Sequence, residues 1–286
     1  MILLSQECAK GKIKMHRFFF FLSFLILSAC SSPAYRAQYT HLRNDFSPCP
    51  PMNESDYFLV ILVNARHLDY ANTSSLLKTI AKHPDDGGKN GDVGHAWIYL
   101  QGIVGGKAVF IEGGHSGELG RVQPKYFDGV MDYIDYGCEP NPIKYLWEIQ
   151  HDGFFQNGSG GHTPSFAAKI DLTQEQFNNI RAFILSDYSN YAEYSLTNHQ
   201  CASFVVQTAA LANFPIDYEI SIPIDQVIRF RGRTLRLWRA PEYSRLRFGS
   251  PDIIERSLMQ SVKEGRAEYA LPWYQKSIMI EAFNRH

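Results

Sequence analysis

The chain has 286 residues, of which 45% are hydrophobic and 20% are charged, and its formal net charge is -1. This composition is typical of a folded globular protein with a real core, in one large or two small domains. It argues against a disordered chain, a collagen-like repeat and a protein whose overall charge would attract nucleic acid.

Residues 1–29 are predicted to be a signal peptide and not part of the fold. Basic residues precede an apolar run at 18–27, which is too short for a comfortable membrane span. The segment 27–30 (LSAC) resembles a bacterial lipobox, which implies that Cys30 is diacylated after cleavage. The resemblance implies a lipid-anchored protein of the bacterial cell envelope, with the periplasmic face of the outer membrane favoured over the inner membrane. An ordinary signal peptide or an N-terminal anchor helix is the alternative, and Met15 is a second candidate start.

Cysteine usage points to a free thiol. Of the 5 cysteines, Cys8 leaves with the signal peptide and Cys30 takes the lipid. An odd number remaining in an exported chain indicates a free thiol or an intermolecular bridge. The simplest arrangement pairs Cys49 with Cys138, which both lie beside prolines, and leaves Cys201 free. No pair of cysteines has zinc-ribbon spacing.

The rest of the chain is expected to form a tether at 30–56, a domain at 57–230 and a C-terminal extension at 231–286 that packs on the domain. Strands are predicted at 57–63, 95–100, 107–112 and 143–149, with 95–112 as a hairpin and 151–164 as a surface loop. Helices are predicted from Thr173, where Gln176 closes a capping box, from Cys201 to about 213–215, and around 253–262. Together these elements predict an α+β fold.

Cys201 and His95 are the candidate catalytic pair. A cysteine in the first turn of a helix meets the positive end of the helix dipole and unpaired N–H groups, which favour the thiolate. A nucleophile also needs a base, and His95 lies at the start of a predicted strand. If Leu100 pairs with Lys107, Glu112 lies opposite His95 at roughly 5 Å and can orient its imidazole.

The register of this hairpin has an alternative. A tighter turn at Gly105 and Gly106 shifts it by four residues and places Ser116 opposite His95, with His115 as its neighbour. Whether Glu112 or His115 orients His95 therefore stays open.

Three segments in this order resemble circularly permuted papain-like hydrolases related to NlpC-type cell-wall peptidases, including the YiiX-like and lecithin–retinol acyltransferase-like branches. The segments are 94–100 (GHAWIYL), 109–112 (VFIE) and 191–205 (YAEYSLTNHQCASFV). The resemblance implies an antiparallel sheet packed against the helix that carries the nucleophile, and a Cys201–His95–Glu112 triad without a cofactor or metal. Two residues separate Asn198 from Cys201, and Ala202-Ser203 replaces the more usual Ser-Glu, which puts the oxyanion donors and the substrate pocket in doubt.

The implied activity is that of a thiol hydrolase that cleaves an amide bond, with peptidoglycan peptides as a candidate substrate. The alternatives are an acyltransferase or lipid-ester hydrolase on the same triad, and a non-catalytic envelope-binding lipoprotein. The partners are then a cell-wall peptide or acyl substrate and the membrane that holds Cys30, with no nucleic acid.

Each candidate residue also has a structural interpretation. A cysteine in an apolar helix is commonly a core residue, Glu112 can be a surface acid, and His115 can be a loop residue or line the cleft. A zinc site formed by His95, His115 and Cys201 is a further alternative.

The segment 229–247 interleaves arginines with aromatic residues. Such a pattern can bind nucleic acid or, in a lipid-anchored protein, lipid headgroups and other anionic polymers. A strand with a solvated arginine face is the favoured interpretation.

Overall fold

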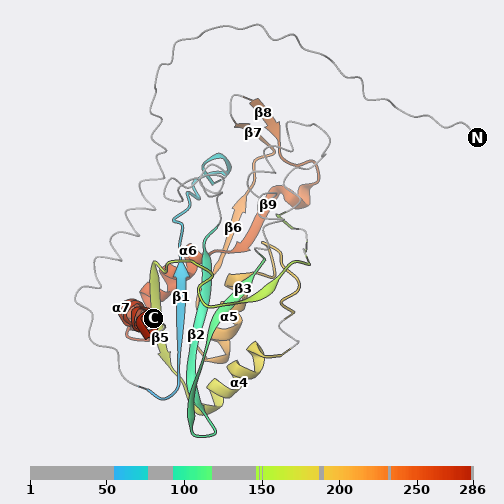
Figure 1. The fold of residues 1–286 in the computed structure, drawn as a ribbon. Helices are drawn as coiled ribbons and strands as arrows, with labels where there is room; N and C mark the ends of the chain where they lie inside the picture. Colours follow the sequence, from blue (N-terminus) through green and yellow to red (C-terminus); the bar gives the residue numbers. More distant parts are fainter. Residues whose placement is uncertain are drawn as a thin grey trace, which may run out of the picture. The chain divides into compact units, whose positions relative to one another are not determined.

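The centre of the protein is a six-stranded antiparallel sheet (Figure 1). The computed structural model describes residues 55–76, 93–117, 146–147, 149, 151–186, 190–230 and 233–284. The sheet has the order β10-β5-β1-β2-β3-β4. Its strands are β1 (Phe58–Asn64), β2 (His95–Val104), β3 (Lys107–Ser116), β4 (Phe154–Asn157), β5 (Phe166–Asp171) and β10 (Glu268–Tyr269). The predicted α+β class is confirmed.

Three helices cover one face of this sheet: α4 (Gln174–Ile184), α5 (Cys201–Leu211) and α6 (Pro251–Lys263). Alternate strand residues such as Ile61, Ala96 and Ile98 point into a core shared with all three helices. Figure 1 shows α4 and α5 alongside β2 and β3, and both helices contact β2. This face is called the α5 face below.

Helix α7 (Leu271–Asn284) covers the opposite face of the sheet. Phe58, Leu62 and Trp97, which alternate with the residues of the α5 face, pack in a cluster with Leu271 and Tyr274. This face is called the α7 face. The sheet therefore has helices on both sides and reads as nearly continuous apolar runs in its central strands.

The β2–β3 hairpin has the tighter of the two registers that the sequence allowed. Val104 pairs with Lys107 across Gly105 and Gly106, whose φ angles are +59° and +76°. Two consecutive residues with positive φ are typical of a type I′ turn, which suits the twist of a two-residue hairpin and favours glycine. The predicted pairing of Leu100 with Lys107 is wrong, because Leu100 pairs with Ile111.

Other predictions have mixed outcomes. The predicted strand at 57–63 corresponds to β1, and the helices predicted from Thr173, from Cys201 and around 253–262 correspond to α4, α5 and α6. Thr173 and Gln176 form the expected capping box, with backbone-to-side-chain distances of 2.8 and 3.2 Å. The loop expected at 151–164 instead contains β4, an edge strand paired with β3.

The strand predicted at 143–149 is not found in the part of it that the structure describes, because Leu146 has 3-10 conformation and Trp147 lies in a turn. Its other residues lie outside the described ones, apart from Ile149, which has no regular structure.

Two small antiparallel sheets follow α5. They pair β6 (Glu219–Pro223) with β9 (Arg245–Gly249), and β7 (Val227–Phe230) with β8 (Arg233–Arg236). Leu246 and Phe248 point into a second core, whereas Arg245 and Arg247 are exposed. Period-2 alternation therefore produces a solvated arginine face on β9. The single strand expected over 229–233, with Arg229, Arg231 and Arg233 on one face, is not found, because Arg229 belongs to β7 and Arg233 to β8.

The C-terminal residues contribute to the central fold. Strand β10 pairs with β5, α6 packs on the α5 face and α7 covers the opposite face. The boundary expected between 230 and 231 lies within the β7–β8 hairpin. None of the helices in the described part of the chain is long and apolar enough to span a membrane.

Candidate functional site

Cys201 is the first residue of α5, as predicted, and its side chain is almost completely buried at 2% exposure. The thiol lies 3.6 Å from Oε1 of Gln200, a distance compatible with a weak S–H hydrogen bond. Nε2 of Gln200 donates to the carbonyls of Leu196, at 3.0 Å, and Gly249, at 2.7 Å. The Gln200 side chain thus fixes the start of α5 against the end of β9, beside the sulfur. No other described residue forms a disulfide with Cys201.

His95 lies on the other side of the sheet from α5. Its ring stacks on Trp97, with centroids 5.7 Å apart, and on His162, at 4.6 Å. Trp97 belongs to the core of the α7 face, whereas α5 packs on the opposite face through Ala202 and Val205. The sheet therefore separates the His95 imidazole from the helix that carries Cys201.

The environment of His95 favours a neutral ring. Burial, as the largest cause, and the nearby His162 and His115 together lower the pKa of His95 to about 3. Its Nε2 atom is buried and has no hydrogen-bond partner among the described residues. A buried imidazole stacked between aromatic rings is well suited to packing, and the expected pairing of His95 with Cys201 is not found.

Glu112 does not lie opposite His95, which corrects the expected triad. In the register of the hairpin Glu112 pairs with Tyr99. Its carboxylate accepts hydrogen bonds from Nε1 of Trp97, at 3.2 Å, and from the hydroxyl of Tyr274 in α7. The physical reason is the two-residue turn, which moves Glu112 four residues along β2. In this position Glu112 connects β2, β3 and α7.

His115 lies on the α5 face, which it reaches from β3. It pairs with Phe155 of β4, and directly opposed residues of antiparallel strands share a face. Phe155 packs in the core of α5 and contacts the ring of Phe204 from that helix. His115 also meets Tyr191 and Tyr194 edge-to-face, and it is 2% exposed. Cys201 and His115 are therefore on the same side of the sheet.

Hydrogen bonding assigns the tautomer of His115. Nε2 lies 3.1 Å from the carbonyl oxygen of Tyr191, which can only accept, so Nε2 carries the proton and Nδ1 the lone pair. Burial is the largest cause that lowers the pKa of His115 to about 4. The backbone carbonyls of Tyr191 and Glu193 oppose this shift, while His199 adds to it. The imidazole is neutral at pH 7.

A buried polar cluster at the start of α6 was not predicted. Asp252 accepts hydrogen bonds from the backbone N–H groups of His67 and Leu68, both at 2.8 Å, and from the Tyr70 hydroxyl at 2.9 Å. Glu255, one turn later, lies 2.9 Å from Nε2 of His67. Burial raises the pKa of Asp252 and raises that of Glu255 well above its ordinary value.

The sequence holds only part of the signal for this cluster. Ser250-Pro251-Asp252 is a typical helix start, with Ser250 as the N-cap and proline in the first turn. It does not reveal that the carboxylate of Asp252 holds a loop far earlier in the chain, at His67, which precedes Asp252 by 185 residues.

The starts of α5 and α6 lie next to each other at the end of the sheet where β2 begins. A Cβ on Gly249 would lie 2.8 Å from Ala202 of α5, and one on Gly94 would lie 3.3 Å from Pro251 of α6. Gly94 precedes His95 and has a φ of +90°, which explains why glycine occupies this crowded position.

Several predicted features lie outside the described residues, namely Cys30 with its proposed lipid, Cys49 and Cys138 with their proposed pairing. In the described part of the chain, no three His, Cys, Asp or Glu side chains are arranged to hold a metal ion. Comparisons with protein-family models, with curated proteins and with solved structures found no match to this chain.

Proposed function

We propose that the protein is a lipid-anchored thiol hydrolase of the bacterial cell envelope that cleaves an amide bond, with Cys201 as nucleophile and His115, in place of His95, as base. The observation that carries the proposal is the position of His115 on the α5 face, with its tautomer fixed by the Tyr191 carbonyl at 3.1 Å. In a thiol dyad one imidazole nitrogen is held by an orienting group and the other faces the sulfur. In this proposal the backbone carbonyl of Tyr191 orients the catalytic histidine, the role that was expected of Glu112.

The proposed reaction has two halves. The thiol proton of Cys201 moves to Nδ1 of His115 while Sγ bonds to the carbonyl carbon, and the backbone N–H groups at the start of α5 stabilise the oxyanion. His115 then protonates the departing amine and leaves a thioester. Water attacks the thioester with His115 as base, which releases the acid and restores the thiol.

Burial sets the conditions for this chemistry. Cys201 and His115 are each 2% exposed, so a substrate reaches them only after local opening. Because burial is the main cause of the low pKa of His115, opening raises that pKa towards the range of an effective base.

The finer fold assignment, a permuted papain-like domain, is part of the proposal. The antiparallel sheet and the packing of α5, which begins at Cys201, on β2 and β3 support it. The position of His95 on the α7 face argues against a strict correspondence with that family, where the strand histidine serves the thiol.

Alkylation tests the dyad directly. The rate of iodoacetamide modification of Cys201 is measured against pH for the wild type and for the His115→Ala and His95→Ala variants, with Cys201→Ser as the control for other thiols. We expect His115→Ala to slow modification at least about tenfold at pH 7, the effect of one unit of thiol pKa, and His95→Ala to leave it within twofold in correctly folded protein. If only His95→Ala slows the modification of Cys201, the assignment of His115 as the base is contradicted.

The substrate class needs a second assay. Purified peptidoglycan fragments and phospholipid vesicles are incubated with the wild type and with Cys201→Ser. Release of amine from the fragments, dependent on Cys201, supports the amide hydrolase. Release of acyl chains from the vesicles without cleavage of the fragments supports acyl transfer or lipid-ester hydrolysis on the same thiol.

The near-complete burial of Cys201 favours a second candidate, a non-catalytic envelope-binding lipoprotein. For this candidate we expect that iodoacetamide does not modify Cys201 in the native protein at any pH from 6 to 9 but modifies it at once after unfolding. That result would remove the enzyme proposal.

A further inference from the structure

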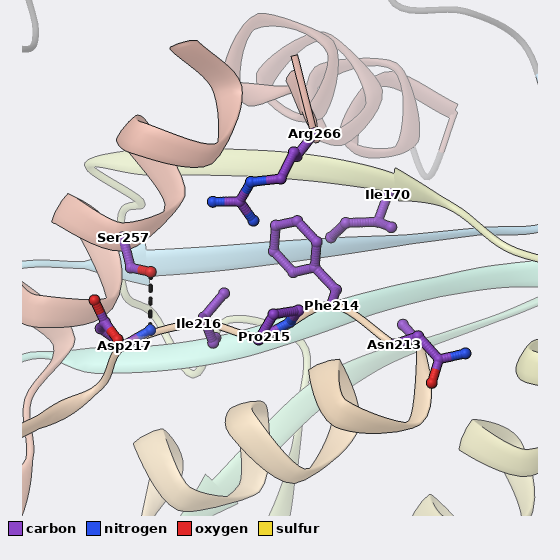
Figure 2. A pocket seen from close by; sticks show the side chains of 9 residues that line it. Ile170, Asn213, Phe214, Pro215, Ile216, Asp217, Ser257 and Arg266 are labelled. Atoms are coloured by element: carbon purple, nitrogen blue, oxygen red, sulfur yellow. Dashed lines mark hydrogen bonds between the residues drawn. The ribbon is translucent and has the colours of Figure 1, made fainter. Parts of the chain in front are cut away.

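A pocket of about 630 Å³ lies at the far end of α5 from Cys201. It is bordered by the residues that follow the helix, 212–217, and by Ser257 of α6 (Figure 2). Helix α5 has 11 residues and is therefore about 16 Å long, so the pocket is distinct from the thiol site. Its volume lies within the range of about 300–1,000 Å³ that is typical of small-molecule sites.

The pocket has an apolar wall. Phe214 and Ile170 are buried, with exposures of 5% and 8%, and lie side by side in Figure 2. Pro215 and Ile216 continue this wall along the segment after α5. Their backbone is held in place, because Oγ of Ser257 accepts a hydrogen bond of 2.9 Å from the N–H of Asp217.

A guanidinium lies over the apolar wall. Figure 2 shows Arg266 directed towards the ring of Phe214, and its Cζ is 5.7 Å from the ring centroid. Such a cation–π contact restrains the guanidinium before any ligand arrives. Nε of Arg266 donates to Glu264 at 2.8 Å, and no described residue occupies the two terminal nitrogens in a hydrogen bond. These nitrogens match the two oxygens of a carboxylate.

We propose that this pocket binds a small organic carboxylate with an apolar body, whose carboxylate pairs with Arg266 and whose body packs on Phe214, Ile170 and Ile216. Asp217 forms the opposite border of the pocket from Arg266 in Figure 2. A second negative charge on the ligand would meet this carboxylate, so the site selects monoanions over polyanions such as nucleoside triphosphates.

Calorimetric titration of the full folded protein with 3-phenylpropionate tests the proposal, with 3-phenylpropionamide as the neutral isostere and ATP as the polyanion. We expect the carboxylate to bind at least about tenfold more tightly than the amide, and ATP not to compete with it. Arg266→Gln should weaken binding of the carboxylate about tenfold and leave the amide unchanged. Arg236→Gln, which removes an exposed arginine of β8, is the matched control and should change nothing.

A second variant keeps the test decisive if Arg266→Gln does not fold. Glu264→Gln removes the anion that competes for Arg266, so 3-phenylpropionate should bind severalfold more tightly to it than to the wild type. The proposal is overturned if the wild type binds none of the three compounds at millimolar concentration, if acid and amide bind equally, or if Glu264→Gln weakens binding of the acid. None of these outcomes depends on Cys201, so they leave the thiol proposal untouched.

Discussion

Glu112 illustrates how a residue suited to catalysis can serve another purpose. Its carboxylate lies on the α7 face, where the indole N–H of Trp97 and the hydroxyl of Tyr274 donate to it. Trp97 is 0% exposed, so its indole N–H would be buried without this acceptor if the carboxylate were removed. Unsatisfied buried donors cost about 1–3 kcal/mol each.

Glu112→Ala should therefore lower the free energy of unfolding by about 1–3 kcal/mol, from the buried Trp97 donor. Glu112→Gln keeps one acceptor oxygen and should cost less, about 1 kcal/mol. Urea unfolding followed by tryptophan fluorescence measures both changes. Neither variant should alter the alkylation rate of Cys201 in the folded protein; a large loss of thiol reactivity in Glu112→Gln at unchanged stability would restore its role as orienting residue.

At the scale of single elements, the parts that could be predicted from the sequence are those with local signals. Thr173 and Gln176 predict the start of α4, because a capping box depends on two residues that are three positions apart in the sequence. Alternating and continuous apolar runs identify β1 and the β2–β3 hairpin. The register of that hairpin could not be predicted with the same confidence, since glycines at both 105 and 106 allow a tight turn and the flanking residues also fit a wider one.

The elements that sequence reasoning missed depend on distant partners. Strand β4 has 4 residues and exists through pairing with β3, and the 2-residue β10 exists through pairing with β5. Within the candidate site, the helix start at Cys201 was predicted. The face of the sheet that His95 and His115 occupy was not, because it depends on which side α5 packs against.

Helix α6 provides a prediction at this scale. The first turn of α6 holds the loop after β1, and Glu255 is fully buried beside the half-exposed His67. His67 has a φ of +57°, a conformation that non-glycine residues rarely adopt and that contacts with Asp252 and Glu255 maintain.

Burial raises the pKa of Glu255 in the folded protein, so the folded state binds its proton more tightly than the unfolded state does. Its contribution to stability is complete below the unfolded pKa and is lost as pH rises towards the folded pKa, at about 1.4 kcal/mol per pH unit. Glu255→Gln should remove this loss, and its advantage over the wild type in urea unfolding should grow from pH 5 to pH 7. Glu175→Gln, which changes an exposed carboxylate of α4, is the control. An advantage that shrinks over this range would contradict the assigned direction.

At the scale of the whole molecule, strands that are far apart in the sequence, from β1 to β10, form one sheet. Strand β1 lies at the centre, β10 at one edge, and α7 closes the face that α4, α5 and α6 leave open. Helix α6 therefore belongs to the same core as α5, the helix that begins at Cys201, and α7 to the core on the other face of the same sheet. A truncation that removes α7 would expose Phe58, Leu62 and Trp97 to water.

The proposed anchor at Cys30 is tested on the full chain in a bacterial host. Metabolic labelling with an alkyne fatty acid should mark the wild type and Cys201→Ser equally and leave Cys30→Ala unmarked, because only the lipobox cysteine accepts the acyl groups. In-gel fluorescence after coupling to a dye measures the label, and fractionation shows whether Cys30→Ala leaves the membrane. Equal labelling of Cys30→Ala would exclude lipid attachment at this position.

The short edge strands of the central sheet affect how copies of the protein can associate when they are crowded together. Its outermost strands are its shortest, and beside β10 the buried amine of Lys169 is neutralised by Glu268 at 3.2 Å and Asp171 at 2.6 Å. Because β4 pairs only with Gly113–Ser116, the Lys107–Glu112 part of β3 has no partner strand on that side among the described residues, and a neighbouring copy could continue the ladder there. If the proposed anchor at Cys30 concentrates many copies on one bilayer, strand addition between copies would begin at this part of β3.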